Sequence, residues 1–192
     1  NFEIRKQLLE YDDVMNKQRE VIYRHRRAVL SGENLTNDLH DMMGSSVESS
    51  LSVYCPPEQY PEEWDVKGLT EVMHGQFGLD ITQGKHDGGD SLRDVGRDAL
   101  LEDLRTHVRD AYTKKEQELG PDLMRFLEKT FMLQVIDHHW KDHLLGMDHL
   151  RDGIGLRGYG QKDPLVEYKR EGFDLFAGMM DRVKSDTLDR LF

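Results

Sequence analysis

The sequence has a single cysteine, Cys55, in 192 residues. An internal disulfide is therefore excluded, and such sparse cysteine use is typical of a protein from a reducing compartment. Long apolar runs are also missing, because even the most apolar stretch, Phe131 to Ile136, is interrupted by Gln134. A membrane helix needs about 18 or more apolar residues in a row. The sequence therefore predicts neither a secretory signal nor a membrane span.

Motifs for nucleotide chemistry and catalysis are scarce as well. No G-x-x-x-x-G-K-[S/T] phosphate loop occurs in the sequence. Gly153, Gly155 and Gly158 make a literal G-x-G-x-x-G. A dinucleotide fold needs a strand before these glycines, whereas here a long helical pattern precedes them. No nucleophile has an identifiable base beside it, so we predict that the chain is not an enzyme by itself.

Charge is abundant but unevenly placed. The chain has a formal net charge of -11, and residues 32–120 hold 8 basic and 19 acidic side chains. The segments on either side, 1–31 and 121–192, are each nearly neutral. An acidic total disfavours non-specific binding to nucleic acid. The charge distribution predicts an acidic module inserted between two other segments.

Residues 1–31 have the pattern of one long helix. Neither glycine nor proline occurs before Gly32, and apolar residues recur at alternating spacings of four and three, with polar interruptions at Gln18 and His25. The positions of this seam are Ile4, Leu8, Tyr11, Met15, Gln18, Ile22, His25 and Val29. The pattern fits either a dimeric coiled coil or a long scaffold helix whose seam serves several partners.

Shorter helical patterns fill residues 32–120. The first covers residues 35–51 and ends at Cys55-Pro56-Pro57, and the second covers residues 64–78. A glycine-containing polar segment, 79–91, predicts a loop, and a third helix is predicted from Leu92 to about Leu119. We therefore expect a small helical domain here.

The last third of the chain predicts a helix hairpin. Gly120-Pro121 separates two helices, since proline is favoured in the first helical turn. The next helix is predicted to reach about Asp152, and the glycines of residues 152–163 are expected to form a non-helical loop. Asp163-Pro164 then caps and begins the final helix. The predicted fold is all-α: a long helix packed on a long antiparallel hairpin, with an inserted small helical domain.

Two histidines four residues apart raise the question of zinc. His139 and His143 have the spacing of helical zinc ligands, but Trp140 follows His139 where a metalloprotease has glutamate. No third ligand is obvious from the sequence. A solvated or interdomain polar face is the favoured interpretation, and a zinc site remains the alternative.

Two stretches are more specific than generic helix. Residues 1–19 read NFEIRKQLLEYDDVMNKQR, and residues 140–164 read WKDHLLGMDHLRDGIGLRGYGQKDP. The first is similar to the start of the helical scaffold domain of the SecA family, the motors of bacterial preprotein export. The second resembles that family's two-helix finger. Residues 61–69, PEEWDVKGL, fit its more variable helical wing.

This resemblance implies a domain organisation and roles for particular residues. Residues 1–31 would be the long scaffold helix, 32–120 the wing, and 121–192 the finger with the remainder of the scaffold. Ile4, Leu8, Tyr11, Met15 and Ile22 would form a seam toward the ATPase and preprotein-binding domains. The finger tip would contact the moving polypeptide and the channel mouth through Leu156, Arg157, Tyr159, Gln161 and Lys162.

The resemblance also implies partners and a location. The family's ATPase domains, preprotein-binding domain and zinc-binding tail lie outside these residues, so ATP, magnesium and zinc would belong to the full-length motor. The expected partners are the SecY channel complex, unfolded preproteins, signal peptides and a second copy of the chain, without nucleic acid. We expect a segment of a longer cytoplasmic protein at the inner face of the bacterial plasma membrane. A free-standing coiled-coil adaptor and a zinc protein using His139 and His143 are the alternatives.

Overall fold

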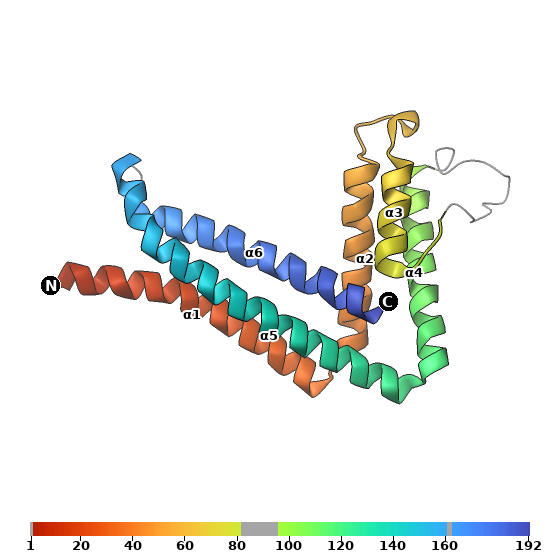
Figure 1. Ribbon diagram of the computed structural model, residues 1–192, viewed down its shortest axis with the longest axis horizontal. Coiled ribbons are helices and arrows are strands. Elements are labelled where there is room, and N and C mark those ends of the chain that lie inside the picture. The colour runs from red at the N-terminus through yellow and green to blue at the C-terminus, as the bar shows by residue number, and fades with distance from the viewer. Residues whose placement is uncertain (1, 82–95, 161–162) are drawn as a thin grey trace. The chain divides into compact units, whose positions relative to one another are not determined.

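The computed structural model describes residues 2–81, 96–160 and 163–192, and every regular element in these ranges is helical (Figure 1). The all-α prediction is confirmed. The α-helices are α1 (Phe2–Ser31), α2 (Leu35–Tyr54), α3 (Val66–Phe77), α4 (Arg97–Leu119), α5 (Pro121–Ile154) and α6 (Pro164–Leu191). Two 3-10 turns are also present, η1 (Pro61–Glu63) and η2 (Gly155–Gly160).

Helix α1 is uninterrupted, including at the polar position Gln18, as predicted. It ends where the sequence places glycine: Gly32 adopts φ 72°, a left-handed conformation that glycine reaches without a steric cost. The Gly32 amide donates to the Ala28 carbonyl at 3.2 Å. The same carbonyl also accepts from the Ser31 hydroxyl at 2.8 Å, so the last turn of α1 is hydrogen-bonded at its end.

The chain divides into two compact units. Unit 1 comprises Asn1–Glu33 and Lys129–Val183, and unit 2 comprises Asn34–Glu128 and Lys184–Phe192. Both α5 and α6 therefore contribute residues to each unit. Unit 2 contains α2, α3 and α4, which the sequence predicted as an inserted helical module. The assignment of 1–31, 32–120 and 121–192 to the family's domains stays a prediction.

Unit 1 is built from α1, the larger part of α5 and most of α6. Ion pairs join Asp12 to Arg151 at 2.9 Å and Arg26 to Asp137 at 2.8 Å. Partner numbers on α5 fall as those on α1 rise, so the two helices are antiparallel, and α6 returns antiparallel to α5 (Figure 1). The inward face of α1 carries the predicted seam: Ile22 and Val29 are buried, and Gln18 lies between apolar neighbours.

Unit 2 packs α2 against α3 and α4. The buried side chains recur at helical spacing: Leu39, Met43, Val47 and Leu51 on α2, Leu69, Met73 and Phe77 on α3, and Leu100, Leu104, Val108 and Tyr112 on α4. The C-terminal residues close this core: Leu188 and Leu191 of α6 are buried, and the ring of Phe192, just after α6, meets Phe77 edge-on at 5.1 Å. The predicted helices of this module are confirmed, except that α4 begins at Arg97 and Leu92 lies outside the described residues.

The hairpin end differs from the predicted loop at 152–163. Helix α5 continues through Gly153 to Ile154, and η2 covers the next six residues. Ile154 is 4% exposed and packs in a cluster with Met147 and Tyr168. Burying such a side chain contributes about 1.5–3 kcal/mol, which exceeds the cost of about 1 kcal/mol for glycine within a helix. Helix α5 therefore extends two residues past its predicted end at about Asp152.

Glycine at position 68 is needed for the start of α3. A Cβ there would lie 2.5 Å from both the Tyr54 ring and Asp65 Oδ2, and Asp65 caps the helix by accepting from the Gly68 amide at 2.9 Å. We expect Gly68→Ala to lower the free energy of unfolding by about 1–3 kcal/mol through overpacking. Gly75→Ala on the same helix meets no atom within 4 Å and should raise it by up to about 1 kcal/mol. Urea unfolding measures both, and equal effects would contradict this prediction.

Candidate functional site

Gln18 connects the three helices of unit 1. The residue is only 7% exposed. Its side-chain amide donates to the Gly172 carbonyl of α6 at 3.0 Å, and its carbonyl oxygen lies 2.7 Å from His143 Nε2 of α5. One side chain of α1 thus binds both arms of the hairpin. The sequence marked Gln18 as a polar interruption, and a buried polar group of this kind requires partners.

His143 is held neutral beside Gln18. The ring stacks on Trp140 at 5.5 Å and meets Phe176 at 5.6 Å. Burial, together with the positive charge of Arg182, lowers the pKa of His143 to about 4. The side-chain NH2 group of Gln18 donates to the Gly172 carbonyl, so the Gln18 oxygen is the atom that faces the imidazole. Nε2 of His143 therefore carries the proton and donates it.

Gly172 of α6 is hydrogen-bonded to Gln18, which in turn meets His143 of α5; we call these three residues the Gln18 node. Gly172 allows α6 to approach the other two closely. A Cβ at position 172 would lie 2.8 Å from Met147 Cε, closer than packed carbons allow. Glycine therefore gives the Met147 side chain room at a point where the Gln18 amide reaches the α6 backbone. The sequence shows this glycine inside a helical pattern but gives no sign of its neighbours.

The hairpin end of unit 1 is tied to the first half of α1. Tyr11 meets Tyr168 edge-on at 4.9 Å, and the Arg151 guanidinium lies 5.8 Å from the centre of the Tyr11 ring. Burial and the charge of Asp163 raise the pKa of Tyr11, while Arg151 acts in the opposite direction. Met15 packs on the buried cluster beside them. This half of α1 and the hairpin therefore share one apolar core.

The predicted seam residues are not equally placed. Tyr11, Met15 and Ile22 lie on the inward face of α1, whereas Leu8 is 48% exposed. The side chain of Ile4 lies outside the described residues. Leu8 and its neighbour Leu9, 69% exposed, therefore leave the first turns of α1 with uncovered apolar surface. Their predicted role as an interdomain contact stays a prediction.

The predicted tip residues are described only in part. Leu156 is 70% exposed beyond the end of α5. The backbones of Arg157 and Tyr159 belong to η2, but their side chains lie outside the described residues, as do Gln161 and Lys162 entirely. A shallow pocket of about 280 Å³ lies beside Leu156 and is lined by His149, Leu150, Gly153 and Ile154. The hairpin end thus presents apolar surface to solvent.

The two spaced histidines of α5 are buried rather than solvated. His139 is 8% and His143 5% exposed, so a solvated face is wrong, whereas the interpretation as an interdomain polar face stays a prediction. His143 is covered by Gln18 of α1 and by Phe176 of α6. Within the ranges that the structure describes, no group of three potential metal ligands occurs, and Nε2 of His143 is already bound by Gln18.

A second buried polar cluster joins α4 to α5 inside unit 2. Glu128 is fully buried and accepts a short hydrogen bond from the Tyr112 hydroxyl. Arg125 lies 2.9 Å from the same carboxylate. Burial raises the pKa of Glu128, while Tyr112 and Arg125 act in the opposite direction. A hydroxyl and a guanidinium thus compensate the burial of this carboxylate, which the sequence analysis had not singled out.

The Gln18 node should be energetically coupled. Gln18→Leu leaves the His143 N–H buried without its acceptor, so we expect a loss of about 1–3 kcal/mol in the free energy of unfolding. Adding His143→Leu to Gln18→Leu should cost less than His143→Leu does alone, because the orphaned donor disappears. Gln117→Leu, on an exposed position of α4, is the control and should change stability by at most about 0.5 kcal/mol. Additive losses measured by urea unfolding would show that the node is not coupled.

Burial of neutral His143 should make stability depend on pH. The folded-state pKa is about 4 and the unfolded value about 6.5, so the unfolded state binds the extra proton first. The contribution is fully present above about pH 6.5 and is lost as pH falls toward 4, by up to about 1.4 kcal/mol per pH unit. His143→Gln should flatten this slope, whereas His138→Gln, at an exposed position, should not. Identical slopes for the parent and His143→Gln would contradict the assignment.

Comparison with known proteins extends along the whole chain. A profile of the SecA wing and scaffold domain matches residues 1–192. The protein translocase subunit SecA of Syntrophus aciditrophicus is 50% identical over 100% of this chain. The corresponding subunit of Pelotomaculum thermopropionicum is 49% identical, also over 100% of the chain.

The chain spans only part of these relatives, 22% of the first and 21% of the second. Among the described helices, none is long and apolar enough to cross a bilayer. The family match covers the seam helix, the inserted helical module and the hairpin alike. On this evidence the chain belongs to the SecA wing and scaffold domain family.

Proposed function

We propose that the chain is the scaffold, wing and finger of an ATP-driven protein translocation motor. In this role it couples the ATPase domains of a full-length motor to the movement of unfolded preproteins through a SecY-type channel. The observation that carries the proposal is the attachment of the α5–α6 hairpin to α1 through Gln18. A hairpin bound in this way follows the displacement of α1.

Several contacts along α1 support force transmission. The helix has 30 residues, or ~45 Å at 1.5 Å per residue. Beyond the node at Gln18, unit 1 holds it at Asp12 and Arg26 by ion pairs and at Tyr11 by ring packing. A rod attached at points along its length moves with its neighbours instead of rotating about one contact.

Two exposed apolar regions, one at Leu8 and Leu9 and one at the hairpin end, are proposed as contacts with the rest of the motor and with the moving polypeptide. Leu8 and Leu9 would be covered by ATPase or preprotein-binding domains of the same polypeptide, which would remove their apolar surface from water. At the other end, Leu156 with Arg157, Tyr159, Gln161 and Lys162 would touch the moving chain and the channel mouth. An aromatic ring with a hydroxyl provides apolar area plus one adaptable hydrogen bond, which suits a substrate of varied sequence.

Catalysis in this proposal lies elsewhere in the motor. The sequence carries no phosphate-binding loop, so ATP and magnesium would bind to the ATPase domains of the full-length protein. The motor would work in the cytoplasm, at the inner face of the plasma membrane, where it would also meet signal peptides. A homodimer remains a further prediction for the full-length protein.

The alternative functions have less support. In a free coiled-coil adaptor the α1 seam would face a second chain, but the part of the seam that includes Ile22 and Val29 is buried within one chain. A zinc protein would need His143 Nε2, which Gln18 already binds. Neither alternative explains why the hairpin and α1 share buried polar contacts.

Tyr159 should be needed for preprotein transport but not for the stability of the fold. We predict that Tyr159 is exposed, and since substitutions at exposed positions usually cost at most about 0.5 kcal/mol, Tyr159→Ala should leave the melting temperature of this chain nearly unchanged. Tyr168→Ala, at a residue 1% exposed, should cost about 3–5 kcal/mol. In a full-length translocase that carries this segment, Tyr159→Ala should impair preprotein uptake into membrane vesicles.

The matched control is Tyr60→Ala, which removes a tyrosine 74% exposed in unit 2. It should change neither the melting temperature nor the uptake. Normal uptake by a motor with Tyr159→Ala would remove this residue from the mechanism. A large loss of stability would instead identify Tyr159 as part of the packed core.

A further inference from the structure

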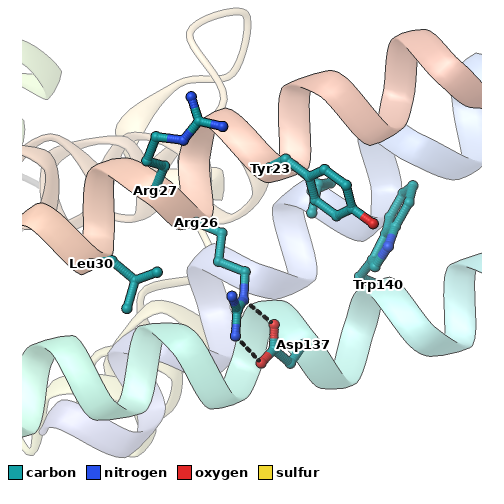
Figure 2. A pocket seen from close by; sticks show the side chains of 7 residues that line it. Tyr23, Arg26, Arg27, Leu30, Asp137 and Trp140 are labelled. Atoms are coloured by element: carbon teal, nitrogen blue, oxygen red, sulfur yellow. Dashed lines mark hydrogen bonds and ion pairs between the residues drawn. The ribbon is translucent and has the colours of Figure 1, made fainter.

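A pocket of about 500 Å³ opens between α1 and α5 within unit 1 (Figure 2). It lies on the side of α1 next to the buried seam, and no feature of the sequence analysis used it. The α1 residues that line it are Ile22, Tyr23, Arg26, Arg27 and Leu30, and the α5 residues are Asp137 and Trp140.

The walls of the pocket expose apolar surface. Tyr23 is 52% and Leu30 44% exposed, and the two lie seven residues apart on one face of α1. Figure 2 shows the Tyr23 ring beside the Trp140 indole, with Leu30 farther along α1. Two antiparallel helices with apolar side chains between them form a groove of the kind that accepts an apolar anchor from a bound peptide.

Of the two arginines that line the pocket, Arg26 is paired with an acidic side chain and Arg27 can bind a ligand carboxylate. Arg26 is engaged by Asp137 through two hydrogen bonds, at 2.8 and 3.2 Å, so this pair is neutral as a unit. In the part of the chain that the structure describes, no ion pair or hydrogen bond engages the Arg27 guanidinium. Residues 19–30 contain four arginines and a single acidic residue, Glu20, in a chain of net charge -11. The pocket is therefore locally basic on an acidic protein.

We propose that this pocket binds an acidic peptide segment. An apolar side chain of the peptide lies between Tyr23, Leu30 and Trp140, and a carboxylate pairs with Arg27. Guanidinium and carboxylate form charge-assisted hydrogen bonds, and charge complementarity of this kind selects the partner more than it raises affinity. Nucleic acid fits less well, because its charge on every phosphate is repelled by the acidic remainder of the chain more strongly than the few carboxylates of a peptide.

The binding test uses the whole 192-residue chain and a fluorescein-labelled synthetic peptide with one phenylalanine flanked by aspartates and glutamates. Fluorescence anisotropy should show saturable binding that weakens with salt. The chain has two tryptophans, so Trp64→Phe leaves Trp140 as the only indole. Binding of an unlabelled peptide should then change the Trp140 emission, which localises the ligand to this pocket.

Two charge reversals on the same helix separate the pocket from general attraction. Arg27→Glu should weaken binding at least about fivefold, because it replaces an ion pair with a repulsion. Arg24→Glu makes the same change in net charge at an exposed position outside the pocket and should weaken binding less than about twofold. Leu30→Ser should also weaken binding without changing the charge.

Four outcomes would overturn the proposal. Equal losses for Arg27→Glu and Arg24→Glu would indicate attraction to the helix in general. Equal binding of a peptide with lysine flanks would show that the peptide carboxylates do not contribute to recognition. The absence of binding at millimolar peptide concentration would show that the pocket is not a peptide-binding site. Arg27-dependent binding of a single-stranded oligonucleotide or of phosphatidylglycerol vesicles, without binding of the peptide, would assign the pocket to another class of ligand.

Discussion

A single uncharged side chain, buried among apolar neighbours, determines how the three helices of unit 1 fit together. Gln18 donates through its NH2 group to a carbonyl of α6, and its side-chain oxygen accepts from His143 of α5. Without either partner the amide would be a buried unsatisfied group at a cost of about 1–3 kcal/mol. The two hydrogen bonds of Gln18 fix the position of α1 against both arms of the hairpin, while burial and Arg182 keep His143 neutral beside it.

Much of the fold could be predicted because the signals are local. Helical spacing identified all six helices, and Gly32, Cys55-Pro56 and Gly120-Pro121 placed the ends of α1, α2 and α4 within a few residues. The partners of Gln18 could not be predicted in the same way, because His143 is 125 residues away and Gly172 is 154 residues away. A polar residue in an apolar seam says that a partner is needed, but it does not name the partner. The same limit applies to Glu128, whose burial in unit 2 depends on Tyr112 and Arg125.

Two errors of the sequence analysis share one physical cause, the burial of a segment by neighbours far along the chain. Helix α5 was expected to end at about Asp152, but it continues to Ile154, which packs against Met147 and Tyr168. A solvated face was one of the two interpretations of His139 and His143, but packing of unit 1 removes both from water. Local composition predicts what a segment prefers alone, and tertiary packing overrides a preference of about 1 kcal/mol. The tip residues from Arg157 to Lys162 remain predictions from the sequence.

The choice of an amide over a charged pair at the centre of unit 1 suits a mechanical role. The exposed pairs of Arg26 with Asp137 and of Asp12 with Arg151 contribute little and can re-form after a small displacement. Gln18 is different, because sliding α1 by one helical turn, ~5.4 Å, would separate it from both partners at once and bury three polar groups unpaired. Relative sliding of α1 and the hairpin is therefore opposed most strongly at this buried point. In the proposed motor, a displacement imposed on α1 would then move the hairpin instead of changing the register between them.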